Sequence, residues 1–270
     1  MFVQATINDQ TGTFLFDTGA SDLILNSAYF TGLDEQSEVV GLYGEVISVK
    51  HFLAHQIVLS GTSVAKDIAL VLDLSAMEKA KKMPIAGILG YSVLKDYELQ
   101  IDFDSLQIML FSLKSNGRRE QESPYSSSDA YDFKMSGHIP YLVVRLGDKT
   151  IRMGIDSGSE RNILQSDMLE AENFEPTGQI NLAGLSPKVK RQEKGYVKSL
   201  RIGDVSLDKL EVVLADFKEV SQELPVQLHG ILGVQFLRQY KVAINFQLRK
   251  IYLWQPTEAA NECRLAICTM

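Results

Sequence analysis

The chain carries one pattern twice, and this internal repeat limits the available folds more than any other feature. Three pairs of segments align along the 270 residues: 2–25 with 141–164, 60–74 with 202–216, and 87–103 with 230–246. The offset rises only from 139 residues (156 − 17) to 143 residues (230 − 87), a drift that short loop insertions produce. The sequence therefore predicts two similar structural units in one chain.

Strand signals dominate within each unit. The run YLVVRL (141–146), the turn residues 147–149 and the run TIRMGI (150–155) together predict a β-hairpin. Runs of this kind alternate with Gly, Asn, Asp and Ser along most of the chain. We therefore expect an all-β, bilobal fold, with two similar β-barrel-like lobes and a cleft between them.

Helix signals are few and short. The segment 75–83 begins with Ser75 and Glu78 in capping-box spacing and stops at Pro84, which predicts one short helix. Two further segments predict one or two helical turns each, 91–97 and 234–240. Helical content this low fits an all-β fold.

A polar, serine-rich stretch divides the chain. Residues 114–138 include almost no aliphatic side chains, which is typical of a linker. We expect four parts: a first lobe at 1–113, a linker at 114–138, a second lobe at 139–256 and a tail at 257–270. Cys263 and Cys268 both fall in the tail, so they form no disulfide framework, while a local bridge and free thiols stay open.

Composition and charge exclude some classes of partner. The formal charge is −7, and the basic clusters at 79–82 and 188–194 are short surface runs, so we expect no nucleic-acid partner. The sequence has no apolar run of about 18 residues, so we expect no transmembrane segment. The first residues lack the features of a secretory signal and begin inside a strand pattern, which suggests a trimmed amino terminus.

One acidic motif occurs in both units. The stretch TFLFDTGAS ends an apolar strand on Asp17, and IRMGIDSGS does the same on Asp156. A single Asp-Ser/Thr-Gly tripeptide would occur by chance in roughly one chain in ten of this length, and a lone aspartate there would cap a turn. The second copy, at the equivalent place in the repeat, favours a shared role. Each unit also carries a later Ile-Leu-Gly, at 88–90 and 231–233.

This constellation resembles the aspartic proteases, and more narrowly their retropepsin-like branch. The motif DTGAS at 17–21 is similar to the retroviral-type signature, and two such units in one chain resemble the pepsin-like bilobal enzymes. The resemblance extends from residue 2 to about residue 254. It implies an aspartic endopeptidase that acts on a peptide or protein substrate without a cofactor or metal, as a monomer because one chain supplies both aspartates. Bacterial relatives of this kind are commonly exported, which favours export, with the signal region missing from this chain.

Asp17 and Asp156 are the expected catalytic residues. Pseudo-twofold symmetry would bring their carboxylates face to face, and two carboxylates roughly 3 Å apart cannot both be ionised, so one proton is shared. The protonated member would polarise a peptide carbonyl while the ionised member takes a proton from a water held between them. Since the titration belongs to the pair, the sequence assigns neither residue as the acid or the base.

The neighbours of the two aspartates have expected supporting roles. Gly19 and Gly158 would let the backbone turn tightly and bring its N–H groups to the carboxylates. By the resemblance, Thr18 and Ser157 would hydrogen bond across the lobe interface and make the loops rigid. Close packing beneath the loops would be permitted by the last glycine of each Ile-Leu-Gly motif, Gly90 and Gly233.

The family covers its cleft with a hairpin flap, and each unit offers a candidate segment. In the first unit the match is VVGLYGEV, in which Gly41 and Gly44 suit a hairpin tip. Tyr43 would contact substrate there, although an exposed turn tyrosine is an equal alternative. The matching segment 182–188 carries Pro187, so the sequence leaves one flap or two undecided.

Other chemistries find little support. His51 and His55 stand four residues apart, but their surroundings predict a strand, where four residues span roughly 13 Å, too far for one metal ion. His138 and His229 are predicted in a loop and a turn. The sequence has no nucleophile elbow, P-loop or dinucleotide fingerprint. The alternative from a different class is a non-catalytic peptide-binding protein that retains the fold.

Overall fold

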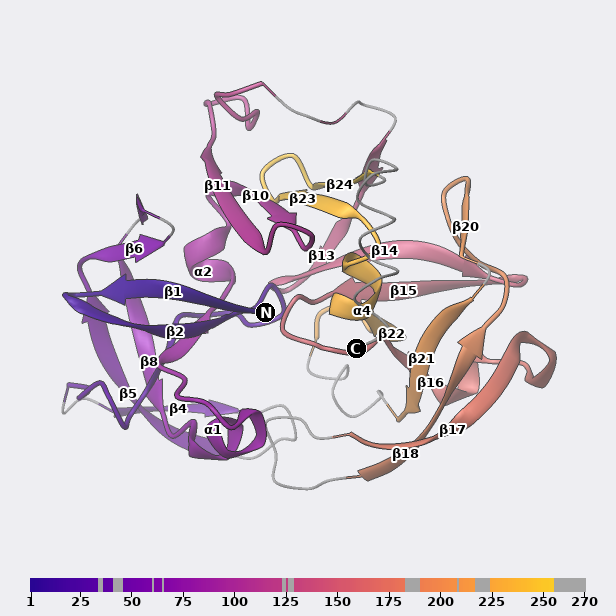
Figure 1. Cartoon of the computed structure of the whole chain (residues 1–270), viewed down its shortest axis with the longest axis horizontal. Helices are drawn as coiled ribbons and strands as arrows, with labels where there is room; N and C mark the ends of the chain where they lie inside the picture. The colour runs from indigo at the N-terminus through magenta and orange to yellow at the C-terminus, as the bar shows by residue number, and fades with distance from the viewer. Residues whose placement is uncertain are drawn as a thin grey trace.

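The structure is a computed structural model, and it describes residues 1–33, 36–40, 46–59, 61–64, 66–122, 125, 129–182, 190–207, 209–216 and 224–254. Most of these residues are in β-strands, whose sheets curl into two lobes, one from each unit of the repeat. In Figure 1 the first lobe, in indigo and purple, lies beside the second lobe, in pink and orange. The expected all-β, bilobal fold is confirmed.

The first lobe is built on a nine-stranded sheet. Its strands are β1 (Phe2–Ile7), β2 (Gln10–Phe16), β3 (Ile24–Asn26), β4 (Gln36–Val40), β5 (Val46–Ala54), β6 (Ile57–Leu59), β7 (Thr62–Val64), β8 (Asp67–Leu72) and β9 (Gly87–Leu89). Their spatial order is β4-β5-β8-β3-β9-β2-β1-β6-β7. Strand β9 runs parallel to β2 and antiparallel to β3, so it passes between the two strands that flank the acidic loop.

The second lobe repeats this sheet strand for strand. Its strands are β13 (Lys134–Ser136), β14 (Ile139–Leu146), β15 (Lys149–Ile155), β16 (Ile163–Gln165), β17 (Phe174–Leu182), β18 (Lys190–Val197), β19 (Leu200–Ile202), β20 (Val205–Leu207), β21 (Leu210–Ala215) and β22 (Gly230–Leu232). The order is β17-β18-β21-β16-β22-β15-β14-β19-β20, with β13 beside β14. Apart from β13, each strand takes the place of the strand thirteen labels earlier. The predicted hairpin at 141–155 is confirmed as β14 and β15.

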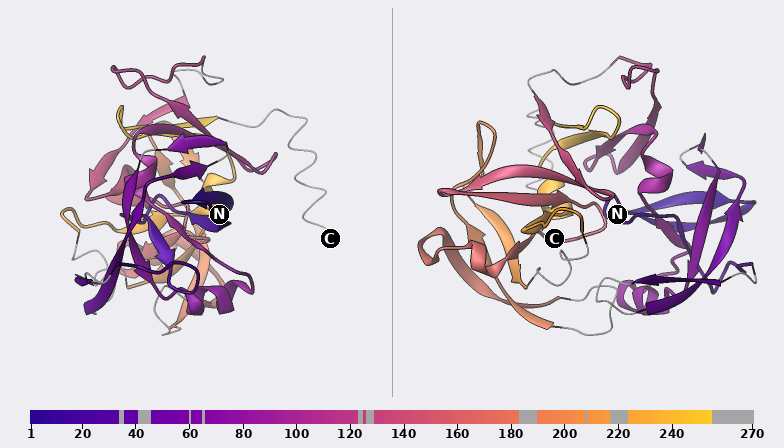
Figure 2. Two further views of the ribbon diagram at one scale, coloured as in Figure 1. Left: turned by 90° about the vertical axis from the view of Figure 1, so that its left-hand side faces the viewer. Right: turned by 180° about the vertical axis from the view of Figure 1, so that it is seen from behind.

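A third sheet joins the two halves. It consists of β10 (Tyr97–Asp102), β11 (Gln107–Ser112), β12 (Ala130–Asp132), β23 (Lys241–Asn245) and β24 (Lys250–Trp254), in the order β11-β10-β23-β24-β12. Strand β10 of the first unit pairs antiparallel with β23 of the second, so backbone hydrogen bonds cross from one half to the other. The views in Figure 2 show this sheet on the same side of both lobes.

Two strands lie inside the segment that was expected as a linker. Strand β12 pairs with β24 of the third sheet, and β13 pairs with β14 of the second lobe. Both pairings use backbone groups, which a polar and serine-rich composition does not reveal. The segment between the lobes therefore takes part in two sheets.

The predicted short helices are present, but the capping box predicted for the first of them, at Ser75 and Glu78, is wrong. The α-helices are α1 (Ser75–Lys81), α2 (Tyr91–Leu94) and α4 (Val234–Leu237), with 3-10 turns η2 (Ser166–Met168) and η3 (Ala171–Asn173). Leu74 is the N-cap of α1, without a side-chain hydrogen bond. The Glu78 carboxylate instead accepts the Ile85 N–H at 2.9 Å and the Tyr29 hydroxyl at 2.7 Å, and these tertiary partners replace the local capping box. No helix in the described part of the chain is long and apolar enough to cross a membrane.

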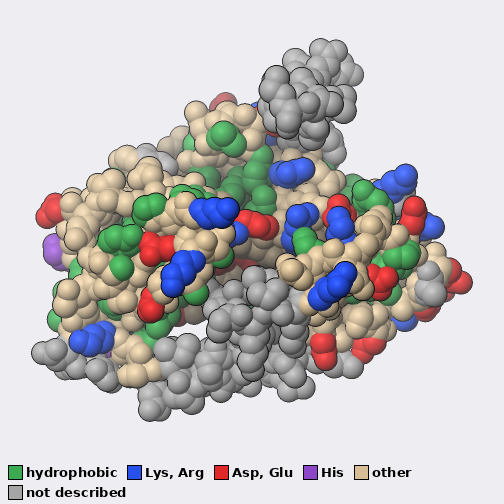
Figure 3. Space-filling model, turned by 60° about the horizontal axis from the view of Figure 1, so that its bottom comes forward, with side chains coloured by type: hydrophobic (Ala, Val, Ile, Leu, Met, Phe, Trp, Pro, Cys, Tyr) green, Lys and Arg blue, Asp and Glu red, His purple; other side chains and the backbone are tan. Residues whose placement is uncertain are grey.

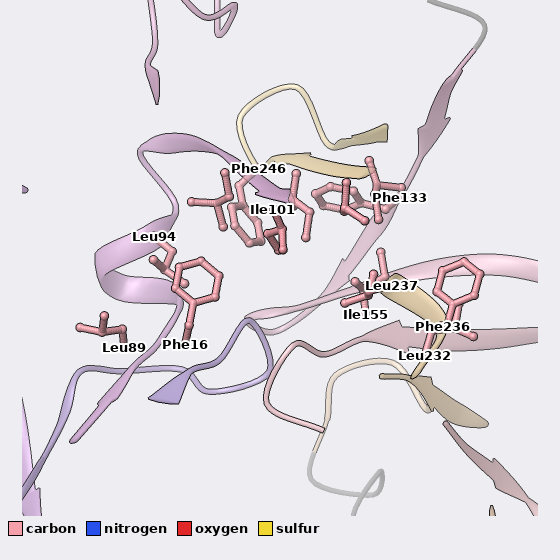
Figure 4. Close-up of a cluster of buried hydrophobic side chains, with 14 of the residues drawn as sticks. Phe16, Leu89, Leu94, Ile101, Phe133, Ile155, Leu232, Phe236, Leu237 and Phe246 are labelled. Atoms are coloured by element: carbon pink, nitrogen blue, oxygen red, sulfur yellow. The ribbon is translucent and has the colours of Figure 1, made fainter. Parts of the chain in front are cut away.

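The apolar core reaches the two loops that carry the acidic motif. Phe16 and Ile155, which directly precede the aspartates, are both 0% exposed. Figure 4 shows Phe16 beside Leu94 of α2, and Ile155 beside Leu237 of α4. Burying a side chain of this size stabilises a fold by roughly 1.5–3 kcal/mol. The strands that lead into the loops are therefore firmly anchored.

The ends of β9 and β22 pack tightly beneath the loops. A Cβ added to Gly90 would lie 2.3 Å from the Asp22 carbonyl oxygen, and one added to Gly233 would lie 2.4 Å from that of Arg161. Real Cβ atoms do not come this close to backbone oxygens, so only glycine fits at either position. The close packing expected at Gly90 and Gly233 is present in both lobes.

Gly233→Ala should destabilise the fold by about 3 kcal/mol, because the added methyl group would meet the backbone of the loop that carries Asp156. Urea unfolding followed by circular dichroism measures the change. Gly203→Asn is the control, since Asn tolerates the φ of +56° at Gly203 and a Cβ there meets nothing closer than 3.5 Å. Equal losses in the two variants would contradict tight packing under the loop.

Candidate active site

Two equivalent loops carry the acidic motif to the boundary between the lobes. Asp17 directly follows β2, and Asp156 directly follows β15. The strand behind each loop holds its backbone, since the Asp17 N–H donates to the Leu89 carbonyl and the Asp156 N–H donates to the Leu232 carbonyl, both at 3.1 Å. The aspartate and the later Ile-Leu-Gly of each unit, far apart in sequence, are therefore hydrogen-bonded neighbours.

Each aspartate is also fixed by the backbone of its own loop. One carboxylate oxygen, Oδ1, accepts two N–H groups in each case: from Gly19 (2.8 Å) and Ala20 (3.1 Å) to Asp17, and from Gly158 (2.7 Å) and Ser159 (3.2 Å) to Asp156. The expected approach of loop N–H groups to the carboxylates is present in both lobes. Such bonds orient a carboxylate and favour its ionised form.

The two carboxylates meet across the lobe boundary. A Cβ added to Gly19 would lie 2.6 Å from Cγ of Asp156, and one added to Gly158 would lie 2.2 Å from Cγ of Asp17. The two carboxyl groups therefore lie close enough for each to affect the protonation of the other. Neither glycine has a positive φ, so the tight turn expected there is not the reason for glycine. The reason is the opposite carboxylate, which occupies the space of a side chain.

The surroundings of Asp156 favour its protonated form. Burial raises the pKa of its carboxyl well above the ordinary value of 3.8, and the charge of Asp17 and the hydrogen bond with it raise this pKa further. The N–H groups of Gly158 and Ser159 lower the pKa, but by less. The pair therefore retains a proton at pH values where an isolated aspartate would be ionised.

A buried exchange of hydrogen bonds locks the two loops together. The Thr18 hydroxyl accepts the Ser157 N–H at 3.0 Å and donates to the Ile155 carbonyl at 3.2 Å. The Ser157 hydroxyl accepts the Thr18 N–H at 3.1 Å and donates to the Phe16 carbonyl at 2.9 Å. Both side chains are 0% exposed. The cross-lobe hydrogen bonds expected of Thr18 and Ser157 are thus present.

Each lobe carries the stem of a hairpin on the same face of the molecule. Strand β4 pairs antiparallel with β5, and β17 pairs antiparallel with β18. In Figure 1 the two hairpins extend toward each other below the acidic loops. The residues predicted for the flap tips lie outside the described residues: Gly41, Tyr43, Gly44 and Pro187. Each lobe therefore has a hairpin stem in the region predicted for a flap.

A hollow lies between the lobes on this face. Figure 3 shows acidic side chains within it and lysine and arginine side chains along its rim. An ion pair crosses between the lobes near this hollow, from Nζ of Lys81 in α1 to Oε1 of Glu160, four residues after Asp156. Lys81 belongs to a cluster that was predicted as solvated surface, and no local signal reveals a partner 79 residues away. At this exposure the pair contributes about 0–1 kcal/mol.

Sequence reasoning also missed polar side chains that brace the two loops. Asn162, which is 0% exposed, accepts the Gly233 N–H at 2.9 Å and donates to the Glu211 carbonyl at 3.0 Å. In the first lobe the Ser92 hydroxyl accepts the Leu23 N–H at 3.1 Å. These two side chains do not align in the repeat, so comparison of the units does not find them.

The histidines are dispersed. His51 lies in β5, and His55 follows directly after this strand, as the strand prediction implied. Within the described ranges, no three His, Cys, Asp or Glu side chains gather closely enough to hold a metal ion. Cys263 and Cys268 lie outside the described residues.

Thr18→Val should lower the free energy of unfolding by about 3 kcal/mol, because it keeps the side-chain shape but leaves the buried Ser157 N–H without its acceptor. Chemical denaturation measures this loss. Thr6→Val is the matched control, since the Thr6 hydroxyl pairs with that of Thr11 on an exposed surface and should matter by less than about 1 kcal/mol. A Thr18 variant no less stable than the control would be inconsistent with the lock.

Asp156→Asn should stabilise the folded protein increasingly as the pH rises. The pKa of Asp156 is raised on folding, so the stability that comes from its protonation is full below its ordinary value of 3.8 and is lost as the pH rises through the higher folded pKa. Thermal unfolding from about pH 3 to pH 8 should show a gap that widens in favour of the variant. Asp148→Asn, at an exposed turn of the second lobe, is the control for removing an aspartate away from the pair. A gap that narrows with rising pH would refute the shift.

Comparison with known families finds the aspartyl protease family model twice in this chain, at residues 3–93 and 142–236. The two matches coincide with the two units of the repeat, and each contains one acidic loop. Comparison with curated proteins finds no matching relative. Because the two matches together cover more than half of the chain, the protein belongs to the aspartyl protease family.

Proposed function

We propose that this protein is an aspartic endopeptidase in which Asp17 and Asp156 form the catalytic pair. The observation that carries the proposal is the reciprocal packing of the loops, in which each carboxylate lies against the glycine of the opposite loop. Titration of the two carboxyl groups is coupled at this close approach, which supports treating them as one unit. Membership of the aspartyl protease family supports a protease-type function.

In the proposed mechanism the pair begins with one shared proton, as the raised pKa of Asp156 favours. The ionised member takes a proton from a water molecule, while the protonated member gives its proton to the oxygen of the peptide carbonyl. The water oxygen bonds to the carbonyl carbon and forms a tetrahedral intermediate that is not covalently bound to the protein. When the C–N bond breaks, one carboxyl protonates the leaving amine and the other recovers a proton from the intermediate, which restores the pair.

Rigid loops favour this mechanism. The hydroxyls of Thr18 and Ser157 each bond to the backbone of the opposite lobe, and they do so where water has no access. The carboxylates therefore need little rearrangement when charge moves between them and the substrate, which is how preorganised groups lower a barrier.

We propose further that the substrate is an extended peptide held in the hollow between the lobes, beneath the two hairpins β4–β5 and β17–β18. The protein is proposed to act as a monomer. One chain supplies both aspartates, and the third sheet joins its two halves through β10 and β23.

Asp17→Asn and Asp156→Asn should each lower kcat/KM for peptide cleavage by more than about a thousandfold, because each removes one proton donor or acceptor from the pair. Mass spectrometry of a mixed peptide library, incubated from about pH 3 to pH 8, identifies the cleaved bonds and supplies a substrate for kinetics. Asp148→Asn, at an exposed turn of the second lobe, is the control and should retain activity.

Two outcomes would count against the proposal. Full activity in either variant of the pair would overturn the assignment of the catalytic residues. A wild type that binds peptides and cleaves none at any pH would favour the alternative, a non-catalytic peptide-binding protein with this fold.

A further inference from the structure

A histidine of the second lobe contacts the loop that carries Asp17. Strands β13 and β14 are joined by the two-residue turn Gly137-His138, in which Gly137 has the positive φ of +60° that such turns favour. The turn projects the His138 ring across the lobe boundary. Its Nε2 atom lies 2.8 Å from the carbonyl oxygen of Gly19.

Buried contacts hold this turn in place. Ser136 is 0% exposed, and its hydroxyl donates to the Val226 carbonyl at 2.7 Å and accepts the Val226 N–H at 3.0 Å. On the other side of the turn, Ile139 is buried in the apolar cluster of the second lobe. His138 is therefore half-buried on a fixed hairpin.

The hydrogen bond from His138 continues to Asp17 through one peptide unit. A carbonyl oxygen only accepts, so Nε2 carries the hydrogen and donates. The peptide unit formed by the Gly19 carbonyl and the Ala20 N–H in turn donates to Oδ1 of Asp17 at 3.1 Å. Hydrogen bonds in series polarise and strengthen one another. His138 thus acts on the Asp17 carboxylate without touching it.

Among the described residues, the loop that carries Asp156 has no such support. The equivalent peptide unit, formed by the Gly158 carbonyl and the Ser159 N–H, donates to Asp156 at 3.2 Å. However, no side chain in the described part of the chain donates a hydrogen bond to the Gly158 carbonyl. Within the described ranges, a side-chain donor therefore supports the peptide unit that binds Asp17, and none supports the equivalent unit that binds Asp156.

The charge of the His138 ring also acts on the pair. Burial lowers the pKa of the ring, whereas the bond to Gly19 and the charges of Asp22 and Asp156 raise it. Since Nε2 already carries a hydrogen, titration occurs at Nδ1 and leaves the bond to Gly19 in place. In acid the protonated ring is a positive charge near Asp156, which favours a net negative charge on the pair.

We propose that His138 is a positioning residue for the aspartate pair, which stabilises the negative charge on Asp17 through the Gly19–Ala20 peptide and so places the shared proton on Asp156. This inference rests on the proposed function, because it assigns the two roles within the same pair. It gives Asp17 the role of the base that receives the proton of water, and Asp156 the role of the acid. The hydrogen bond from His138 thereby makes the two loops unequal, although their sequences are nearly the same.

Kinetics of two His138 variants test the role. His138→Ala removes the donor and should lower kcat about tenfold with little change in KM. His138→Gln keeps a neutral N–H donor and should recover part of kcat. In both variants the acid limb of the kcat/KM profile should move to higher pH by roughly half a unit, because the positive ring no longer favours the first ionisation of the pair.

His229→Gln is the matched control. The His229 ring is also half-buried in the second lobe, but it accepts the Arg152 N–H at 3.0 Å, and within the described residues it has no hydrogen bond to either acidic loop. This variant should keep the wild-type kcat and the wild-type acid limb. A shift as large in His229→Gln as in His138→Gln would indicate a general effect of losing a histidine.

An NMR titration of protein labelled with ¹³C at the aspartate Cγ tests the same proposal without substrate. In the wild type the Asp17 signal, assigned by its loss in Asp17→Asn, should follow the first ionisation of the pair, and the Asp156 signal the second. In His138→Ala each signal should follow both steps. If the wild type cleaves peptides and the His138 variants match it in kcat, in the acid limb and in the titration, the role of His138 is overturned and the proposed protease function is not. A wild type that cleaves nothing would count against the protease, while the titration would still decide the order of ionisation.

Discussion

Two partly buried carboxylates held against each other are the constraint on which the rest of this structure depends. Burial and like charge both oppose full ionisation, so the pair is stable only with a shared proton and only if the loops cannot separate. The hydrogen bonds between Thr18 and Ser157 hold the two loops together. Gly19 and Gly158 have no side chain, which leaves room for the carboxylate of the opposite loop. The stability of the fold would favour separating the two carboxylates, whereas the proposed chemistry needs them close together.

Keeping the loops together also requires that the lobes stay together. The backbone pairing of β10 with β23 supplies this, and a buried polar cluster reinforces it. The Glu98 carboxylate, only 2% exposed, accepts hydrogen bonds from the Asn245 side chain at 3.0 Å and from Arg119 at 3.4 Å. Removing one partner from such a cluster leaves a buried charge unpaired, which is strongly destabilising. Arg119 comes from the segment between the lobes, so this segment helps to close the third sheet.

The repeat and its motifs predicted the two lobes, the hairpin at 141–155 and the meeting of Asp17 with Asp156, because these follow from local periodicity and equivalent positions. The contacts from Lys81 to Glu160 and from His138 to Gly19 were not predicted. They join residues 79 and 119 apart, and side-chain partners so distant leave no local signal in the sequence. Strands β12 and β13 were missed because backbone pairing leaves little trace in a polar composition.

The separation of the carboxylate oxygens of Asp17 and Asp156, measured in a high-resolution crystal structure of the protein, tests the shared-proton pair. If the pair is correct, the shortest oxygen–oxygen distance should be that of a hydrogen bond, about 2.5 to 3.0 Å. A separation beyond about 6 Å, with the loops locked by Thr18 and Ser157 and no room to close, would contradict it.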